Sequence, residues 1–534
     1  MKPTVQTPVR RAYRGRIVTM DANDTVLPDG IVYIRDNQIV AVSRSGNIAP
    51  PEFDRVRVIS TRGTIYPGLI ELHNHLSYDA LKLWQVPETY TNRDAWGRHP
   101  DYRRLISGPM NVLGKTAGFA EAIVRYVECK CLLGGVTTSQ GIALFSNAGI
   151  VRFYRGLVRN AEVSNGPGMP AAEARIADVV AKDAAKFLEH LNKSSCLLLH
   201  LSEGTDARAR SHFETLTLPD GQIAITKALV GIHCAALTRR DFGLMAARGA
   251  SMVWSPLSNL LLYGATADVK AANEEGVSIG LGSDWSPSGS KNLLAELKIA
   301  KRYSEHAGGI FSDREIVAMA TRNGAKILKW DQAVGSIEAN KRADLMVVRG
   351  MTGDPYRHLI EASESDVVLV VIDGVPRSGT PALMPASGAR TERWKVAGTE
   401  RLLNIADDAE EMVASLSLAE AAERLKEGLR NLKALAIEAE KPRPSAAAFS
   451  ADGRPRWFLQ LDHEEPGNIS IRPRLGNMGG APEKIRDIVF AAATPLSKLL
   501  GPLELDAITT VDDADYVPRL KAGRNLPQAM KDGL

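Results

Sequence analysis

The sequence is poor in cysteine, in long hydrophobic runs and in blocks of charge of one sign. Its 534 residues include four cysteines, which are too few and too scattered for a disulfide-stabilised fold and fit a reducing compartment. No run of about twenty apolar residues is present, so no segment is expected to span a membrane. Residues 1–16 carry basic side chains with no apolar stretch after them, unlike a secretory signal. These absences favour a cytoplasmic protein.

The charged residues nearly balance, with 66 basic and 62 acidic side chains and a net charge of +4. No long basic block is present, so nucleic acid is not an expected partner. The hydrophobic content of 44% and the charged content of 24% are typical of a globular protein. The length exceeds that of one ordinary domain and predicts a large core domain with additions. The oligomeric state stays open, with a homo-oligomer as one alternative.

Short β-branched runs near the N-terminus predict strands at residues 16–20, 30–34 and 38–42, with turn-forming residues between them. Such strands are too few to bury a core alone, so they need partners from elsewhere in the chain. The runs at 343–348 and 366–374 are the candidates. We therefore expect a small β-sandwich made of residues 1–65 and 336–405 and split by a long insertion.

The insertion, residues 66–335, alternates strand-like runs with helical patterns, including a helix over residues 170–191. This alternation predicts a parallel sheet with crossover helices, and a length of about 270 residues suits a (β/α)8 TIM-like barrel. A flat, doubly wound α/β sheet is the alternative, but its phosphate-binding glycine fingerprint is not found.

The remaining part, residues 406–534, is predicted to be a C-terminal α/β extension of unknown role. Ser417 and Glu420 form a capping box at the start of an amphipathic helix. A strand is expected at 457–461 and a helix at 482–500. An oligomer contact or a cover for the barrel is the simplest interpretation of this extension.

Two histidines lie two residues apart at the end of an apolar run that follows a Pro-Gly turn. Side chains at i and i+2 of a strand share a face, so His73 and His75 are expected to project together with a spacing suited to one metal ion. Such a pair alone is weak evidence, because ten histidines in a chain of this length will sometimes fall two apart by chance.

Other polar residues follow the ends of further predicted strands. His200 and His233 each end an apolar run, and Asp284 follows the run 278–282. In a barrel of this kind the active site lies at the carboxyl ends of the strands. One histidine there is more often a buried structural residue, but four histidines and an aspartate at strand ends are hard to explain by packing.

At these positions the sequence resembles the amidohydrolase superfamily, over residues 12–400. The motifs that carry the resemblance follow the superfamily's order: Pro-Gly-Leu-Ile-Glu-Leu-His-Asn-His at 67–75, Gly-Val-Thr-Thr at 135–138, His-Leu-Ser-Glu at 200–203, Ile-His-Cys at 232–234, Ser-Pro-Leu-Ser-Asn at 255–259, Gly-Leu-Gly-Ser-Asp at 280–284 and Gly-Ser-Ile-Glu at 335–338. The spacing of His200 and Glu203 is similar to that of the mononuclear branch, which contains nucleobase, adenosine-like and triazine deaminases and chlorohydrolases.

The resemblance implies one divalent metal ion held by four ligands: His73, His75, His200 and Asp284. Zinc is the expected ion, with iron or manganese as alternatives. Binuclear members often add a carboxylated lysine, but Lys182 and Lys186 fall in a predicted helix and not at a strand end. A divalent cation lowers the pKa of its water towards neutrality.

Three residues are the expected catalytic groups. The resemblance implies that His233 contacts the activated water or the substrate. Asp284 can also take a proton from the water, and Glu203 can shuttle a proton to a ring nitrogen and to the leaving group. A solvated loop carboxylate is the alternative interpretation of Glu203.

The substrate is expected to be a small, planar, polar heterocycle. The loop after His75, residues 76–109, is rich in aromatic residues and contains Trp84, Arg93 and Trp96 as candidate substrate contacts. Many superfamily members carry a histidine where Trp254 stands, which makes Trp254 a fourth candidate. Surface packing explains tryptophan and arginine equally well.

The leading hypothesis is a metal-dependent hydrolase of a non-peptide carbon–nitrogen bond that deaminates a cyclic amidine. The same chemistry permits ring opening of a cyclic amide or dechlorination of a triazine. An inactive barrel that serves as a binding or assembly protein is the alternative from another class. Such proteins typically lose ligands, and none is missing here.

Overall fold

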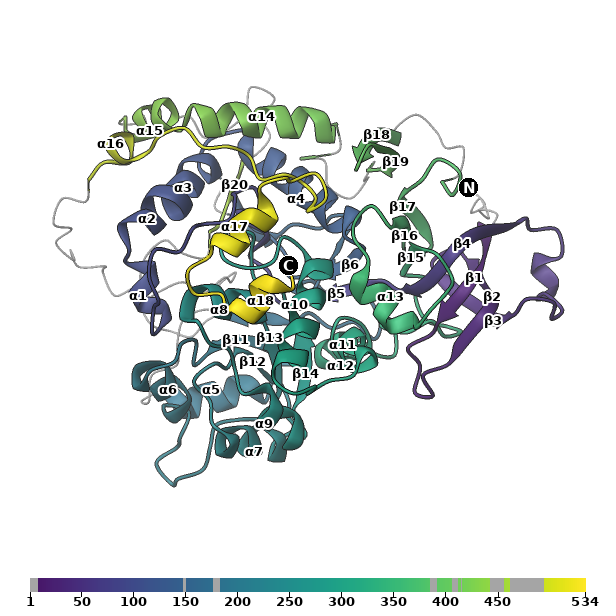
Figure 1. The fold of residues 1–534 in the computed structure, drawn as a ribbon, viewed down its shortest axis with the longest axis horizontal. Coiled ribbons are helices and arrows are strands. Elements are labelled where there is room, and N and C mark those ends of the chain that lie inside the picture. The colour runs from purple at the N-terminus through teal and green to yellow at the C-terminus, as the bar shows by residue number, and fades with distance from the viewer. Residues whose placement is uncertain are drawn as a thin grey trace.

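The computed structural model describes residues 8–146, 150–175, 183–384, 391–405, 412–413, 415–441, 456–461 and 494–534. The chain is an α/β protein with three parts. A sheet at one end contains the N-terminal strands, parallel strands surrounded by helices form the centre, and helices α14 (Leu418–Arg430) and α15 (Leu432–Glu440) lie across the top (Figure 1).

Nine strands of the described chain form one sheet, in the order β18-β19-β17-β16-β15-β4-β1-β2-β3. Its members are β1 (Arg10–Val18), β2 (Val26–Arg35), β3 (Gln38–Arg44), β4 (Val58–Pro67), β15 (Leu345–Arg349), β16 (Val367–Ile372), β17 (Val375–Gly379), β18 (Thr391–Val396) and β19 (Thr399–Asn404). The N-terminal strands meet the late segment where β4 pairs antiparallel with β15, with Ile65 opposite Val347. The expected pairing of these two distant segments is therefore confirmed, while the domain boundaries stay predictions.

The sheet follows the period of two expected for strands. Leu345 and Val347 of β15 pack into one apolar cluster with Ile17 and Ile65, whereas Met346 and Val348 point to the other face and join the main core. Strand β15 is thus buried on both faces, which explains its continuous apolar sequence.

The centre of the molecule contains two parallel sheets. One has five strands: β10 (Glu173–Arg175), β11 (Leu197–Leu201), β12 (Leu229–His233), β13 (Ser251–Trp254) and β14 (Ser278–Leu281). The other has three: β5 (Leu69–Glu71), β6 (Val136–Ser139) and β9 (Arg159–Asn160). All neighbouring pairs in both sheets run parallel.

Main-chain hydrogen bonds join the two parallel sheets at both ends. At one end the Ala172 N–H donates to the Ala161 carbonyl (2.8 Å). At the other end the Asp284 N–H donates to the His73 carbonyl (2.9 Å), and the His75 N–H donates to the Asp284 carbonyl (2.6 Å). The segment after β5 therefore lies directly beside the segment after β14.

Helices alternate with these strands as the sequence predicts. The helices that follow or separate these strands are α4 (Phe119–Leu133), α5 (Ala184–Leu191), α6 (Ala207–Glu214), α7 (Arg239–Ala247), α8 (Pro256–Tyr263), α9 (Val269–Glu274), α10 (Leu293–His306), α11 (Asp313–Met319), α12 (Arg322–Leu328) and α13 (Pro355–Glu361). Side-chain caps fix their starts, as where the Asn292 carboxamide oxygen accepts from the Ala295 N–H at the start of α10.

The helix expected over residues 170–191 is wrong in its first part. Residues 173–175 form strand β10, because they pair with β11 in a parallel ladder, and only α5 is helical. Residues 176–182 lie outside the described part of the chain.

The C-terminal extension packs onto the central part. Helix α14 begins with the predicted Ser417–Glu420 capping box and packs against α4, and β20 (Trp457–Leu459) pairs with β7 (Ala143–Ser146), which also pairs with β8 (Val151–Phe153). The last described helices are α16 (Leu496–Leu499), α17 (Tyr516–Ala522) and α18 (Gln528–Asp532). Of the helix expected over 482–500, residues 482–493 lie outside the described residues.

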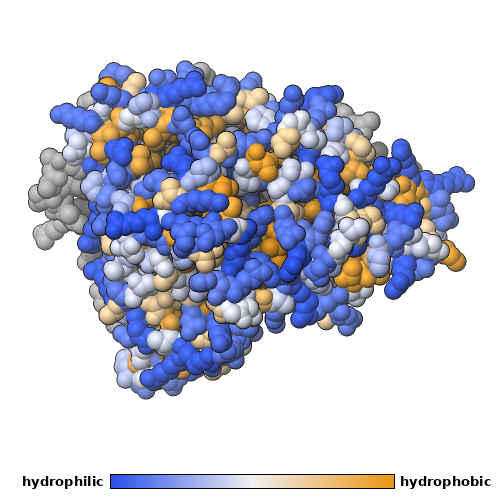
Figure 2. Space-filling model, in the orientation of Figure 1, coloured by the Kyte–Doolittle hydropathy of each residue, from blue (hydrophilic) through white to orange (hydrophobic). Residues whose placement is uncertain are grey.

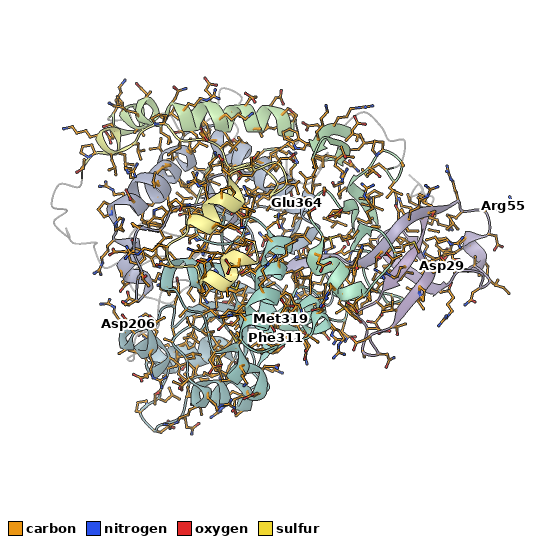
Figure 3. The ribbon with its side chains drawn as sticks, viewed as in Figure 1. Asp29, Arg55, Asp206, Phe311, Met319 and Glu364 are labelled. Atoms are coloured by element: carbon orange, nitrogen blue, oxygen red, sulfur yellow. The ribbon has the colours of Figure 1, made fainter. Side chains whose placement is uncertain are left out.

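Asp506 of the extension is buried and joins two buried lysines. Its carboxylate accepts from Lys130 Nζ on α4 (2.8 Å) and from Lys291 Nζ (2.6 Å). Lys130 also donates to the Asp79 carbonyl and to the Ser286 hydroxyl. Glu364, labelled in Figure 3, accepts from Asn292 and from Thr510 and so ties the extension to α10. The C-terminal segment is therefore part of the core.

The face of the molecule shown in Figure 2 is mainly hydrophilic, with hydrophobic side chains in small scattered areas. No helix among the described residues is both long and apolar enough to cross a membrane.

We predict that Asp506→Asn lowers the free energy of unfolding by about 3 kcal/mol, because removing one partner of a buried ion pair leaves an uncompensated charge. Burial alone would lower the pKa of Lys130, but Asp506 and Asp79 outweigh burial and raise it, so this lysine stays charged. Denaturant unfolding measures the change, and Asp532→Asn, at an exposed position of α18, is the matched control. Equal midpoints for both variants would contradict this account.

Candidate active site

The predicted ligands and His233 all lie at or next to the ends of parallel strands. His73 and His75 follow β5, His200 lies within β11, His233 is the last residue of β12, and Asp284 follows β14. His233 and Asp284 have left-handed backbone, with φ of 66° and 68°. Such conformations cost free energy in residues other than glycine and cluster at functional sites. They turn the chain so that the side chains point inward from the strand ends.

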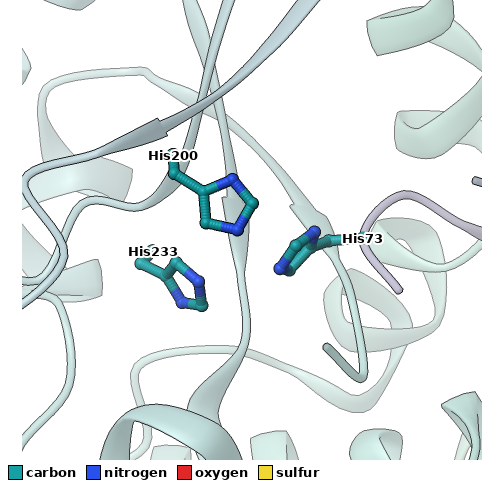
Figure 4. A group of neighbouring side chains, drawn as sticks. All are labelled: His73, His200 and His233. Carbon is teal, nitrogen blue, oxygen red and sulfur yellow. The ribbon is translucent and has the colours of Figure 1, made fainter. Parts of the chain in front are cut away.

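The four imidazoles converge on one place. The ring centroids of His73 and His200 are 4.7 Å apart, those of His73 and His75 4.9 Å, and those of His200 and His233 5.3 Å. Figure 4 shows that His73, His200 and His233 point toward one another. All four side chains are buried. The structure therefore brings together every histidine that the sequence marked.

Asp284 completes the group. Its Oδ1 lies 3.0 Å from His73 Nε2 and 3.5 Å from His75 Nε2, and its Oδ2 accepts a hydrogen bond from the Ser258 hydroxyl. His73 Nε2 has no hydrogen-bond partner within the described chain despite its closeness to Asp284, because the geometry is not that of a hydrogen bond. The spacing of this nitrogen and this oxygen is compatible with two ligands of one cation. The nitrogen and oxygen donor set suits a divalent metal ion.

Amide side chains fix two of the rings. Gln140 Oε1 accepts from both His73 Nδ1 (3.0 Å) and the Asn74 N–H (3.1 Å). The backbone donor identifies this atom as the oxygen, so His73 Nδ1 carries the proton and Nε2 keeps its lone pair. Asn259 Oδ1 lies 2.9 Å from His233 Nδ1 in the same way. Orienting partners of this kind are typical of metal-binding histidines.

Burial keeps the imidazoles of His73 and His200 neutral, and the neighbouring imidazoles keep the Asp284 carboxylate ionised. Burial lowers the pKa of His73, and it lowers the pKa of His200 still more because the other imidazoles and Arg93 add to its effect. Burial raises the pKa of Asp284, but the neighbouring imidazoles, His73 first, outweigh this and hold it below the usual range. Neutral imidazoles and an ionised carboxylate are the forms that bind a metal.

Glu203 lies beside this group with one oxygen held and the other unpaired. Oε1 accepts from the Tyr263 hydroxyl (2.6 Å), whereas the buried Oε2 has no hydrogen-bond partner among the described residues. Oε2 lies 3.8 Å from His233 Nε2, too far for a hydrogen bond. A carboxylate is therefore held next to the histidines with one oxygen available.

The 76–109 segment covers the site with aromatic rings. It includes the short helices α1 (Arg93–Gly97) and α2 (Pro100–Tyr102) and the π-helix Arg103–Ser107. The ring centroids of Trp96 and Trp285 lie 5.9 Å apart, and those of Trp285 and His75 lie 5.6 Å apart. Trp96 is thus two ring contacts away from a predicted ligand.

The other candidate substrate contacts fall in different places. The Arg93 N–H donates to the Glu203 carbonyl (3.4 Å), and its charge contributes to the lowered pKa of His200. Trp84 stacks near Tyr90 and lines a cavity of about 480 Å³ between the 76–109 segment and residues 502–504. None of the predicted metal ligands lines that cavity.

Trp254 lies on the outer side of its strand. Its ring packs against Tyr303 and Phe311 (Phe311 is labelled in Figure 3), and its Nε1 donates to the Thr266 hydroxyl (2.8 Å). Asn259 Nδ2 donates to the same hydroxyl (3.0 Å). Trp254 therefore supports the amide that orients His233, and the substrate contact expected for it stays a prediction without support from these contacts. Strand alternation turns this side chain towards the helices.

Several site residues were missed from the sequence: Gln140, Ser258, Asn259, Tyr263 and Trp285. Ser258 and Asn259 lie within the Ser-Pro-Leu-Ser-Asn motif, and Gln140 directly follows β6, so motif and strand position could have identified them. Tyr263 ends a helix and carries no such signal. For the lysines weighed as binuclear ligands, Lys186 lies on α5 and Lys182 is outside the described residues.

Comparison with known proteins identifies the class. Residues 157–377 match the model of the amidohydrolase family. The matched range includes His200, Glu203, His233 and Asp284. This match confirms the predicted resemblance to the amidohydrolase superfamily.

Among curated proteins, the chain is similar to deaminases named for two nucleosides. It is 25% identical over 396 residues to the 5-methylthioadenosine/S-adenosylhomocysteine deaminase of Desulforudis audaxviator, covering 65% of this chain and 88% of that protein. It is 26% identical over 412 residues to the enzyme of the same name from Halalkalibacterium halodurans, covering 67% and 91%.

Solved structures share the fold. The zinc complex of atrazine chlorohydrolase TrzN from Arthrobacter aurescens has a TM-score of 0.53 at 20% identity, over 71% of this chain and 97% of that one. An adenosine deaminase from Xanthomonas campestris with bound zinc has a TM-score of 0.51 at 19% identity, over 78% and 98%.

We predict that the purified protein contains about one divalent ion per chain and that His73→Ala or His200→Ala removes it, because each substitution deletes a ligand from a buried set. Elemental analysis measures the ratio. His190→Ala, a half-buried histidine of α5 that pairs with Glu173, is the control and should keep the metal. Two ions per chain in the wild-type protein would refute the single-metal site.

Proposed function

We propose that this protein is a metal-dependent deaminase of an amino-substituted nitrogen heterocycle. The observation that supports this most directly is Glu203, whose unpaired carboxylate oxygen lies beside His233 and next to the His73–His75–His200–Asp284 group. A water-derived nucleophile, a proton donor and a leaving amine then have partners within one buried site. Membership of the amidohydrolase superfamily makes hydrolysis of a non-peptide carbon–nitrogen bond the reaction class.

The proposal includes the architecture. The five-stranded and three-stranded parallel sheets contribute eight strands in chain order, and main-chain hydrogen bonds link them at both ends. We take them as one closed (β/α)8 barrel, inserted in the β-domain formed by residues 1–65 and 336–405. The deaminase and hydrolase neighbours support this assignment through their fold.

His73, His75, His200 and Asp284 would hold the metal, and zinc is the proposed ion because zinc-bound structures are among the neighbours. A divalent cation there supplies Lewis acidity, which lowers the pKa of water towards neutrality. Ser258 holds Asp284 Oδ2 and leaves Oδ1 directed at the histidines.

The side chains of this chain then divide the proton transfers. Asp284 accepts a proton from the attacking water, and His233, fixed by Asn259, accepts a hydrogen bond from that water through Nε2. Glu203 carries one proton of the water through Oε2 to the ring nitrogen, and it then carries the proton taken up by Asp284 to the departing amine. Water adds to the amidine carbon, the carbon–nitrogen bond to the exocyclic amine breaks, and ammonia leaves as the carbonyl forms.

The proposed substrate class follows from the names of the curated relatives and from the aromatic rings of the 76–109 segment that covers the site. The curated relatives are named for adenosine derivatives, and the Trp96 and Trp285 rings suit a planar base. Dechlorination of a triazine and opening of a cyclic amide are the alternatives that use the same groups.

We predict ammonia release from 5-methylthioadenosine, S-adenosylhomocysteine or adenosine in a screen that also contains guanine, pterins and triazines, with the metal content measured for each preparation. Chloride release from a chlorotriazine without ammonia would replace the deaminase by a dechlorinase. Failure on every compound, with one metal ion bound per chain, would refute the deaminase proposal.

We predict that Glu203→Gln keeps its metal and loses about a hundred- to ten-thousand-fold in kcat, because the amide keeps the shape of the side chain but cannot shuttle a proton. Asp284→Asn is the contrasting variant and should lower both metal content and rate. Near wild-type turnover by Glu203→Gln would show that the assigned proton pathway is wrong.

A further inference from the structure

A hydrogen-bonded chain joins the 76–109 segment to Glu203. Trp96 Nε1, on helix α1, donates to the Tyr263 hydroxyl (2.8 Å), and this hydroxyl donates to Glu203 Oε1 (2.6 Å). All three side chains are buried. The Tyr263 hydroxyl thus accepts a hydrogen bond from Trp96 of the 76–109 segment and donates one to Glu203 at the same time.

The main chain connects the same two parts. The Thr205 N–H donates to the Thr91 carbonyl (2.7 Å), and the Arg93 N–H donates to the Glu203 carbonyl (3.4 Å). Asn92, which caps α1, also donates through Nδ2 to Asp206 (2.5 Å), the residue that caps α6 and is labelled in Figure 3. The start of α1 is therefore attached to the turn that carries Glu203.

Glycine is required at this junction. Gly204 has a φ of 139°, and a Cβ added there would lie 2.4 Å from the Thr91 carbonyl oxygen and 2.6 Å from Asn92 Cα. Any larger residue would push residues 91–92 away from the Glu203 turn.

We propose that Tyr263 is a positioning residue that couples docking of the 76–109 segment to the orientation of Glu203. This inference rests on the proposed function, since it concerns the acid–base group of that site. When Trp96 is in place, Tyr263 is held so that Glu203 Oε1 is occupied and Oε2 faces His233. When the segment moves away, Glu203 loses the group that aims it.

The chemistry of tyrosine suits this role. Burial, followed by the charge of Glu203, raises the pKa of Tyr263 well above its ordinary value, so the hydroxyl keeps its proton and remains a donor. Phenylalanine preserves the ring and its packing but removes both hydrogen bonds. Tyr263→Phe is therefore a selective test.

The first experiment measures kinetics with the best substrate of the ammonia-release screen. We expect Tyr263→Phe to lower kcat about ten- to a hundredfold, with a change in KM of less than about threefold and full metal content, because the loss concerns orientation of the acid–base group. Trp96→Phe should lower kcat in the same direction. The double variant should be no slower than Tyr263→Phe alone, because both act through one hydroxyl.

The second experiment requires no turnover. Arg98 lies exposed just after α1, so the rate of trypsin cleavage in the 76–109 segment reports on its docking. Coupling is reciprocal, so Tyr263→Phe and Glu203→Ala should both accelerate this cleavage severalfold, and Gly204→Ala should do so most. Tyr90→Phe is the matched control, because its buried hydroxyl has no hydrogen-bond partner among the described residues.

The outcomes separate the two proposals. Faster cleavage in Tyr263→Phe and Glu203→Ala, with Tyr90→Phe at the wild-type rate, supports the coupling even if no deaminase substrate is found. Wild-type cleavage rates in Tyr263→Phe and Glu203→Ala would overturn it. An unchanged kcat in Tyr263→Phe, with an active wild-type enzyme, would overturn it as well.

Discussion

The site depends on main-chain hydrogen bonds between the segments that follow β5 and β14. The Asp284 N–H binds the His73 carbonyl, and the His75 N–H binds the Asp284 carbonyl. These bonds join residues more than two hundred positions apart and fix the distance between an imidazole pair and a carboxylate. The charge and hydrogen-bonding of every other site residue follow from this alignment, because it determines where the donor atoms converge. A shift of one residue in either segment would turn the ligands to the opposite face.

Much of this arrangement could be predicted from the sequence, because strand ends with polar residues are visible as local patterns. His73, His75, His200, His233 and Asp284 each follow or end an apolar run, and the structure brings all five together. The split β-sheet was also predictable, since short strands need partners. Strand β10 was not, because three residues contain too little periodicity to oppose a helical pattern, and only their pairing with β11 decides the outcome.

Other features come from tertiary contacts that leave no local trace. Tyr263 ends a helix like many other aromatic residues, and its importance arises from two side chains that lie 60 and 167 positions away. Trp254 shows the converse case. Its position beside a site motif suggested a substrate contact, but the side chain points towards helices and acts through Thr266 and Asn259. Sequence position identified the strand end without giving the direction of the ring.

The burial of Asp506 has a consequence for how the protein is made. Chains are synthesised from the N-terminus, and the central strands with Lys130 and Lys291 emerge from the ribosome long before Asp506 does. Until then the two ammonium groups lack the carboxylate that both contact in the finished protein. The two lysines therefore reach their final contacts only after the segment that contains Asp506 has been synthesised. A chain that terminates just before Asp506 contains all the predicted metal ligands. Its two buried lysines lack their shared counter-ion, so its folded state is less stable than that of the longer chain.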